Sequence, residues 1–85
     1  MTTRESDAAA YAARKESGAR VRDARMRVGM SQAELGNKIG EADTFVAAME
    51  RGRVVFSKDL IDRLSIALRA AGLLGHGTVL GVGQR

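Results

Sequence analysis

The chain has 85 residues, and its 14 Lys and Arg against 10 Asp and Glu give a formal net charge of +4. This length holds one domain with a small core, and the absence of cysteine excludes the disulfides and thiolate metal sites that stabilise many small domains. Self-association is the remaining means of stabilisation, so we expect a homodimer. Apolar runs are only a few residues long, so we expect neither a membrane span nor a secretory signal. We therefore expect the protein to be cytoplasmic.

The first 18 residues are predicted to form a flexible or partly helical arm. They are small and polar with an Ala-rich patch, and Gly18 is expected to interrupt any helix that runs onward. From about residue 19 to residue 28, apolar residues at i, i+3 and i+7 predict a helix with a narrow buried stripe. The members of the stripe are Val21, Ala24 and Val28.

A second helix is predicted to begin at Ser31. The Ser31 hydroxyl can cap the amide of Glu34 while the Glu34 carboxylate reaches back to the Ser31 amide. Gly40 is expected to end this helix, because a sharp turn there needs a residue that tolerates positive φ. Met30 is placed to pack against Leu35 as a hydrophobic staple. The residues expected to face inward are Ala33, Leu35 and Ile39, with Gly36 on the side that the next helix approaches.

A third helix is predicted from about Asp43 to Arg51, with Gly52 as its stop. Its apolar edge consists of Phe45, Val46 and Met49.

A fourth helix is predicted to start after Ser57, which supplies its cap. The loop before it is expected to close over the core, and the tail at residues 72–85 is Gly-rich. Within this tail, residues 78–80 are long enough only to add an edge strand to a partner chain. The apolar residues of the fourth helix are Leu60, Ile61, Leu64 and Leu68, and those of the loop are Val54, Val55 and Phe56.

Together these spacings resemble the helix-turn-helix domain of Cro and the phage repressors, known as the XRE family, over about Val21 to Ala71. In that family, a helix ends in a Gly, which is followed by an apolar residue and then by Ser/Thr-Gln. The second helix contains a small residue, a Gly stands at the turn, and Glu-Arg-Gly lies close to the third helix. The resemblance implies an all-α fold, a compact lambda-repressor-like bundle of four to five helices at residues 19–71 between the arm and the tail. The matching residues are Gly29-Met30-Ser31-Gln32, Gly36, Gly40 and Glu50-Arg51-Gly52.

The resemblance also implies DNA contacts around the third helix. Gln32 combines an amide donor with free backbone N–H groups at a helix start, an arrangement suited to a phosphate oxygen. Glu50 is expected to form local ion pairs with Arg51 and Arg53, leaving one of these arginines free to reach a phosphate. Alanines on the outward face can touch only a thymine methyl group. The predicted DNA-binding residues are Gln32, Asp43, Thr44, Ala47, Ala48, Arg51, Arg53 and Arg25, the last within a segment, residues 14–27, that holds six basic residues.

These observations predict a sequence-specific transcriptional regulator that binds double-stranded operator DNA as a homodimer, associated with the nucleoid. Two copies of the third helix would occupy successive major grooves about 34 Å apart. The alternative is a protein-interaction module of the same fold, an antitoxin or anti-activator whose partner is a toxin or a transcription factor. With one His and no phosphate-binding loop, we predict no enzyme activity, no metal site and no cofactor.

Overall fold

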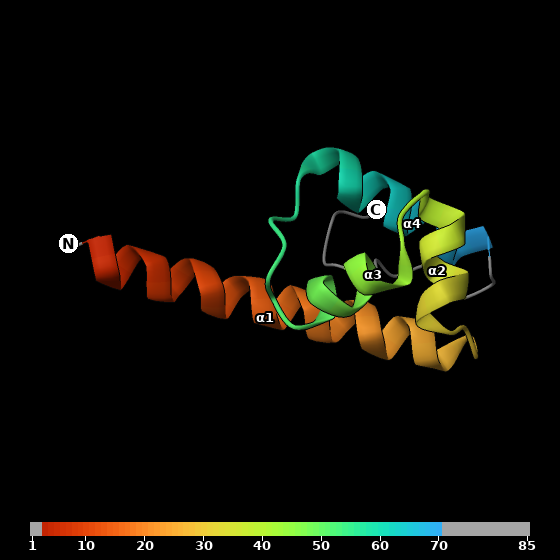
Figure 1. The fold of residues 1–85 in the computed structure, drawn as a ribbon, viewed down its shortest axis with the longest axis horizontal. Helices are drawn as coiled ribbons and strands as arrows, with labels where there is room; N and C mark the ends of the chain where they lie inside the picture. The colour runs from red at the N-terminus through yellow and green to blue at the C-terminus, as the bar shows by residue number, and fades with distance from the viewer. Residues whose placement is uncertain (1–2, 71–85) are drawn as a thin grey trace.

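The computed structural model describes residues 3–70, with side chains described from residue 7 onward. These residues form four helices and no strand, so the predicted all-α fold is confirmed (Figure 1). The expected strand at residues 78–80 lies outside the described residues. The four helices are α1 (Thr3–Arg27), α2 (Gln32–Ile39), α3 (Asp43–Glu50) and α4 (Lys58–Ala70).

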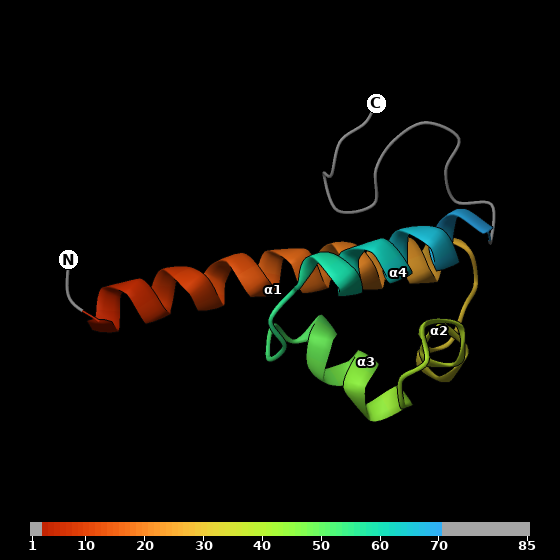
Figure 2. The ribbon, with the colours of Figure 1, turned by 90° about the horizontal axis from the view of Figure 1, so that it is seen from above.

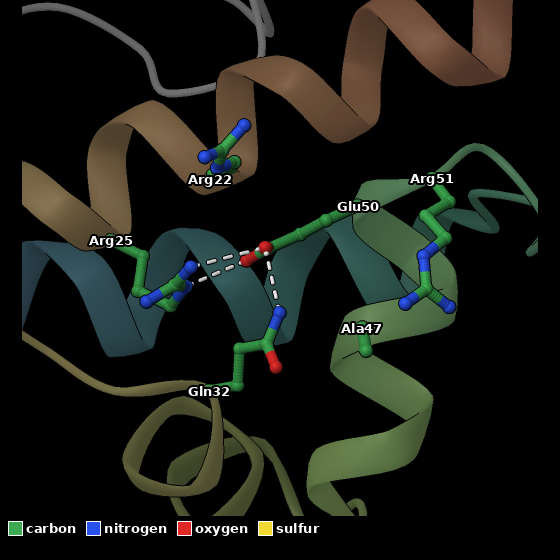
Figure 3. A pocket seen from close by; sticks show the side chains of 6 residues that line it. All are labelled: Arg22, Arg25, Gln32, Ala47, Glu50 and Arg51. Atoms are coloured by element: carbon green, nitrogen blue, oxygen red, sulfur yellow. Dashed lines mark hydrogen bonds and ion pairs between the residues drawn. The ribbon is translucent and has the colours of Figure 1, made fainter.

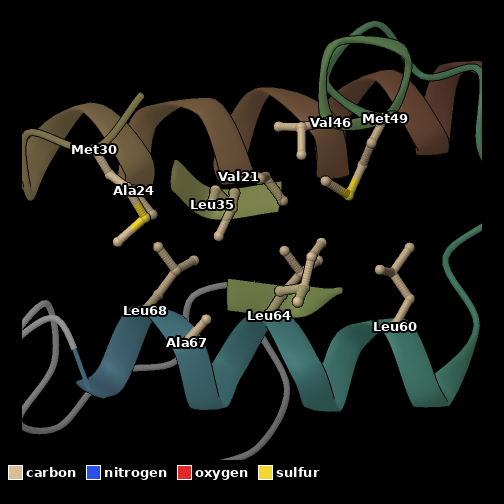
Figure 4. Close-up of a cluster of buried hydrophobic side chains, with 11 residues drawn as sticks. Val21, Ala24, Met30, Leu35, Val46, Met49, Leu60, Leu64, Ala67 and Leu68 are labelled. Carbon is tan, nitrogen blue, oxygen red and sulfur yellow. The ribbon is translucent and has the colours of Figure 1, made fainter. Parts of the chain in front are cut away.

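The two longer helices, α1 and α4, run alongside each other, and the short α2 and α3 lie together on one side of them (Figure 2). Apolar side chains from all four helices meet in a single core (Figure 4). Val46, Met49 and Leu64 are fully buried there, so the core holds α3 to both longer helices. Its members are Val21, Ala24, Met30, Leu35, Ile39, Val46, Met49, Leu60, Leu64, Ala67 and Leu68.

Two predicted core positions are wrong. Ala33 is exposed, because the short α2 buries only the stripe that contains Leu35 and Ile39. Val55 is 73% exposed, since only its neighbours Val54 and Phe56 pack against the core. The loop before α4 therefore leaves an apolar side chain at the surface.

Gly18 does not interrupt the first helix, which is a correction to the predicted boundary at residue 19. Gly18 is buried, and a Cβ atom there would collide with the carbonyl oxygen of Met49 and lie 2.7 Å from that of Glu50. The lack of a side chain at Gly18 therefore allows α1 to pack closely against the C-terminal end of α3. Its cost to helix propensity, about 1 kcal/mol relative to Ala, is outweighed by this packing.

The predicted start of α2 is confirmed. The Glu34 amide donates to the Ser31 hydroxyl at 3.0 Å, and the Ser31 amide donates to the Glu34 carboxylate at 2.7 Å. The hydrogen bond that the Ser31 backbone amide donates to the Glu34 carboxylate is the main cause of a lowered pKa of Glu34, and the Ser31 side chain adds to it. Met30 and Leu35 are both buried in the core, as the staple predicts.

The turn between α2 and α3 is held in place by contacts from α2 and from α4. Gly40 caps α2 with a φ of 78°, and Gly36 faces the turn so closely that a Cβ atom would lie 2.5 Å from the Glu41 carbonyl oxygen. From α4, Arg63 donates to the Ile39 carbonyl at 2.6 Å and to the Glu41 carboxylate at 3.2 Å. The Glu41 hydrogen bond contributes most to a raised pKa of Arg63. Sequence reasoning did not foresee this arginine.

Replacing Leu64 by Ala should destabilise the domain by about 2–5 kcal/mol, because the change empties a fully buried site. Ile66→Ala on the same helix is the matched control, since Ile66 is 67% exposed and its truncation should cost far less. Chemical denaturation of both variants measures the two values. Equal losses would show that α4 does not bury the face described here.

The capping box should give a pH-dependent contribution to stability. Because the pKa of Glu34 is lowered in the folded state, its contribution is present above its ordinary value of 4.5 and is lost as the pH falls through the lower folded value. We expect the difference in free energy of unfolding between the parent and Glu34→Gln to be constant near neutral pH and to shrink in this acidic range. Denaturation curves at several pH values, with Glu16→Gln as control, measure it. A difference that grows on acidification would contradict the assignment.

Candidate nucleic-acid interface

The α2–turn–α3 unit exposes one side of α3. Val46 and Met49 bury the opposite edge completely, which fixes the rotation of the helix about its own axis. Asp43 and Thr44 are then exposed in its first turn. Ala47 and Ala48 follow as half-buried residues, so the rest of the face is shallow and uncharged.

The carboxylate of Glu50, at the last residue of α3, joins three helices. Arg25 on α1 donates to it from Nε at 2.7 Å and from Nη2 at 3.1 Å, and Gln32 on α2 donates from Nε2 at 3.2 Å (Figure 3). The side chains of Arg25 and Glu50 are only 12% and 5% exposed. A two-pronged, shielded ion pair of this kind fixes geometry more firmly than a surface pair does.

The expected ion pairs of Glu50 with Arg51 and Arg53 are therefore wrong. The carboxylate turns inward to a residue 25 positions earlier in the chain, and the described residues contain no ion pair between Glu50 and either neighbour. The prediction assumed that residues close in sequence also lie close in space. At a helix end, however, the side chains of adjacent residues point in different directions.

Arg25 is also committed to the protein. Its third nitrogen, Nη1, donates to the Met30 carbonyl at 2.8 Å, so every nitrogen of the guanidinium has an acceptor within the chain. The side-chain amide of Gln32 donates one hydrogen bond to Glu50, and its second hydrogen remains available to another acceptor. Gln32 is the first residue of α2, so this amide lies near the backbone N–H groups of the first helical turn. That Arg25 and Gln32 contact DNA stays a prediction. The structure shows that both side chains bind Glu50 and so help to hold α3 in position.

The other predicted arginines behave differently. Arg51 and Arg53 are exposed, and their side chains have no hydrogen bond or ion pair with any residue that the structure describes. Arg22 on α1 shares this property and was not singled out from the sequence, although its position three residues before Arg25 places both on one side of the helix. In Figure 3, Arg22 lies above the Glu50 carboxylate and Arg51 to its right.

These side chains surround a polar pocket of about 300 Å³. The exposed cations Arg22 and Arg51 and the amide of Gln32, all of which line it, suit an anionic group such as a phosphate. Its lining residues are Arg22, Arg25, Gln32, Ala47, Glu50 and Arg51.

Among residues 7–70, no group of His, Asp or Glu is placed to hold a metal ion. None of the described helices is long and apolar enough to cross a membrane.

Breaking the Glu50 ion pair should be costly. Glu50→Ala leaves the shielded Arg25 without its counterion, and we expect a loss of about 3–5 kcal/mol in the free energy of unfolding. Glu16→Ala removes a Glu from the exposed pair with Arg20 and should cost less than about 1 kcal/mol. Urea denaturation of both variants tests the contrast, and similar losses would mean that Glu50 is no more important than a surface carboxylate.

In a comparison with known protein families, residues 16–74 match a model described as a helix-turn-helix domain. This match covers more than half of the chain, and the chain therefore belongs to that family. Neither the curated proteins nor the solved structures gave a match. Family membership and the all-α fold together support a DNA-binding protein of transcription regulation.

Proposed function

We propose that this helix-turn-helix protein is a sequence-specific transcriptional regulator that binds operator DNA as a homodimer, with α3 in the major groove. The observation that carries the proposal is the inward Glu50 carboxylate. By accepting hydrogen bonds from Arg25 and Gln32, it turns the carboxylate next in sequence to Arg51 away from the exposed surface. The surface beside the C-terminal end of α3 thereby keeps the exposed cations Arg22 and Arg51, which a phosphate backbone attracts.

The charged contacts in this proposal are contacts to phosphate. Arg22, Arg51 and Arg53 are exposed, their side chains have no partner among the described residues, and they flank α3 at one end. Gln32 adds its remaining amide hydrogen at the start of α2. Such contacts set the position of the protein on the duplex and carry no sequence information by themselves.

Sequence would be read by the first turns of α3. The exposed Thr44 hydroxyl can donate to or accept from a base edge, and Asp43 can accept from a cytosine amino group. Ala47 and Ala48 permit a close approach of the helix and apolar contact with thymine methyl groups. Because this set offers no bidentate reader, we expect the shape and deformability of the DNA to contribute much of the selectivity.

Arg51→Ala should weaken binding to all duplexes by a similar factor, since it removes a phosphate contact. We expect the slope of log affinity against log salt to become shallower by about one. Arg69→Ala, which removes an equal charge from the exposed C-terminal end of α4, is the control and should leave the slope almost unchanged. Fluorescence anisotropy with labelled duplexes at several salt concentrations measures both slopes.

Equal slopes in the parent and Arg51→Ala would remove Arg51 from the interface. If the parent chain binds no duplex at low salt, the regulator proposal fails. The alternative of a protein-binding module for a toxin or transcription factor, which the uncharged Ala-rich face of α3 would suit, would then be preferred.

A further inference from the structure

The first half of α1 extends beyond the rest of the fold. In Figures 1 and 2 it projects past the loop that follows α3, with no other helix beside it. Residues 7–13 are all exposed, and the first hydrogen bond that ties α1 to the loop is the one from Arg14 Nε to the Gly52 carbonyl, at 2.9 Å. More than two helical turns thus stand outside the core.

One side of this projecting segment continues the buried stripe of α1. Ala10, Arg14 and Ser17 precede Val21 and Ala24 at alternating spacings of three and four, so all five lie on one side of the helix. We call Asp7, Ala10, Ala13, Arg14 and Ser17 the α1 face.

The α1 face forms one wall of an apolar pocket. The pocket has a volume of about 310 Å³, and its other wall is the loop before α4. Val55 in that wall is 73% exposed, and Tyr11 beside the α1 face is 42% exposed. The lining residues are Ala10, Ala13, Arg14, Ser17, Val55 and Phe56.

We propose that the α1 face is a homodimer interface in which two α1 helices pair antiparallel and each covers the other's pocket. Charge supports a second copy of this chain as the occupant. Asp7 lies at one end of the α1 face and Arg14 lies seven residues further along it, and the described residues offer Asp7 no ion pair. A two-fold axis between residues 10 and 11 places Asp7 opposite the partner's Arg14, whereas a parallel pairing would align like charges.

The shape of the face suits the same occupant. Near the two-fold axis, the α1 face consists of the alanines Ala10 and Ala13, whose small side chains allow two helix axes to approach closely. The paired segment, residues 7–14, is about 12 Å long at 1.5 Å per residue, and Val55 from each copy would cover its flank. Both walls bring small or apolar groups to the contact, so pairing removes exposed apolar surface from water.

This interface supplies the dimer that the proposed function requires, and in that respect it rests on that function. The pocket adjoins the loop after the C-terminal end of α3, while Asp43 and Thr44 lie at the N-terminal end of that helix. Pairing through the α1 face therefore leaves the first turn of α3 uncovered in each copy.

The test is sedimentation equilibrium of the full chain and two matched variants. Ala10→Glu places two carboxylates near the two-fold axis, and Ala8→Glu places the same group about 200° away around the helix. We expect the parent to sediment at twice the 9.1 kDa of one chain. The dimer dissociation constant should rise by about tenfold or more for Ala10→Glu and change by less than about twofold for Ala8→Glu.

A third variant, Val55→Glu, changes the other wall of the pocket at an exposed position and should weaken the dimer as Ala10→Glu does. Circular dichroism should give the same helix content for every variant, since all three positions are exposed. A parent that stays monomeric at high micromolar concentration, or equal effects of Ala10→Glu and Ala8→Glu, would overturn the inference. A monomer whose DNA affinity still depends on Arg51 would refute this interface alone, and a dimer that binds no DNA would refute the regulator proposal alone.

Discussion

The arrangement of this small domain depends on one carboxylate. Glu50 ends α3, and its two oxygens accept hydrogen bonds from Arg25 on α1 and from Gln32 at the start of α2. The position of α3 relative to its two neighbours is therefore fixed by polar contacts at its last residue and by Val46 and Met49 along its buried edge. Desolvating such a pair is costly, and its benefit is a defined geometry more than net stability. For a helix that must meet a partner surface at a set angle, that geometry is the useful property.

The same contact determines which charges remain at the surface. Within one short region, Arg25 is neutralised and shielded while Arg22 and Arg51 stay exposed around the pocket. The second support of the turn, Arg63 from α4, likewise uses its charge within the protein, on Glu41 and the Ile39 carbonyl. The chain's excess of basic residues is thus divided between arginines that hold α2 and α3 in place and arginines that can attract an anion.

Much of the fold could be predicted from the sequence, because its signals are local. The Ser31 capping box, the Gly40 cap and the apolar periodicity of α4 each act within a few residues, and the structure confirms all three. The errors concern contacts between distant parts of the chain. Gly18 was read by its helix propensity, although its lack of a side chain serves packing against α3, and the inward turn of Glu50 toward Arg25 depends on a residue 25 positions away. The roles of the predicted DNA contacts on α3 remain predictions.

If the protein binds DNA as proposed, the first turn of α3, the start of α2 and the exposed Arg51 together form the surface that meets the duplex. Backbone amide NMR signals of the full chain, followed while a short duplex is added, test this most directly. We expect the largest shift changes on Gln32, Thr44 and Arg51 and little change on α4, and we expect added salt to reverse the effect. Changes concentrated on α4, or an unaltered spectrum at low salt, would contradict the proposal.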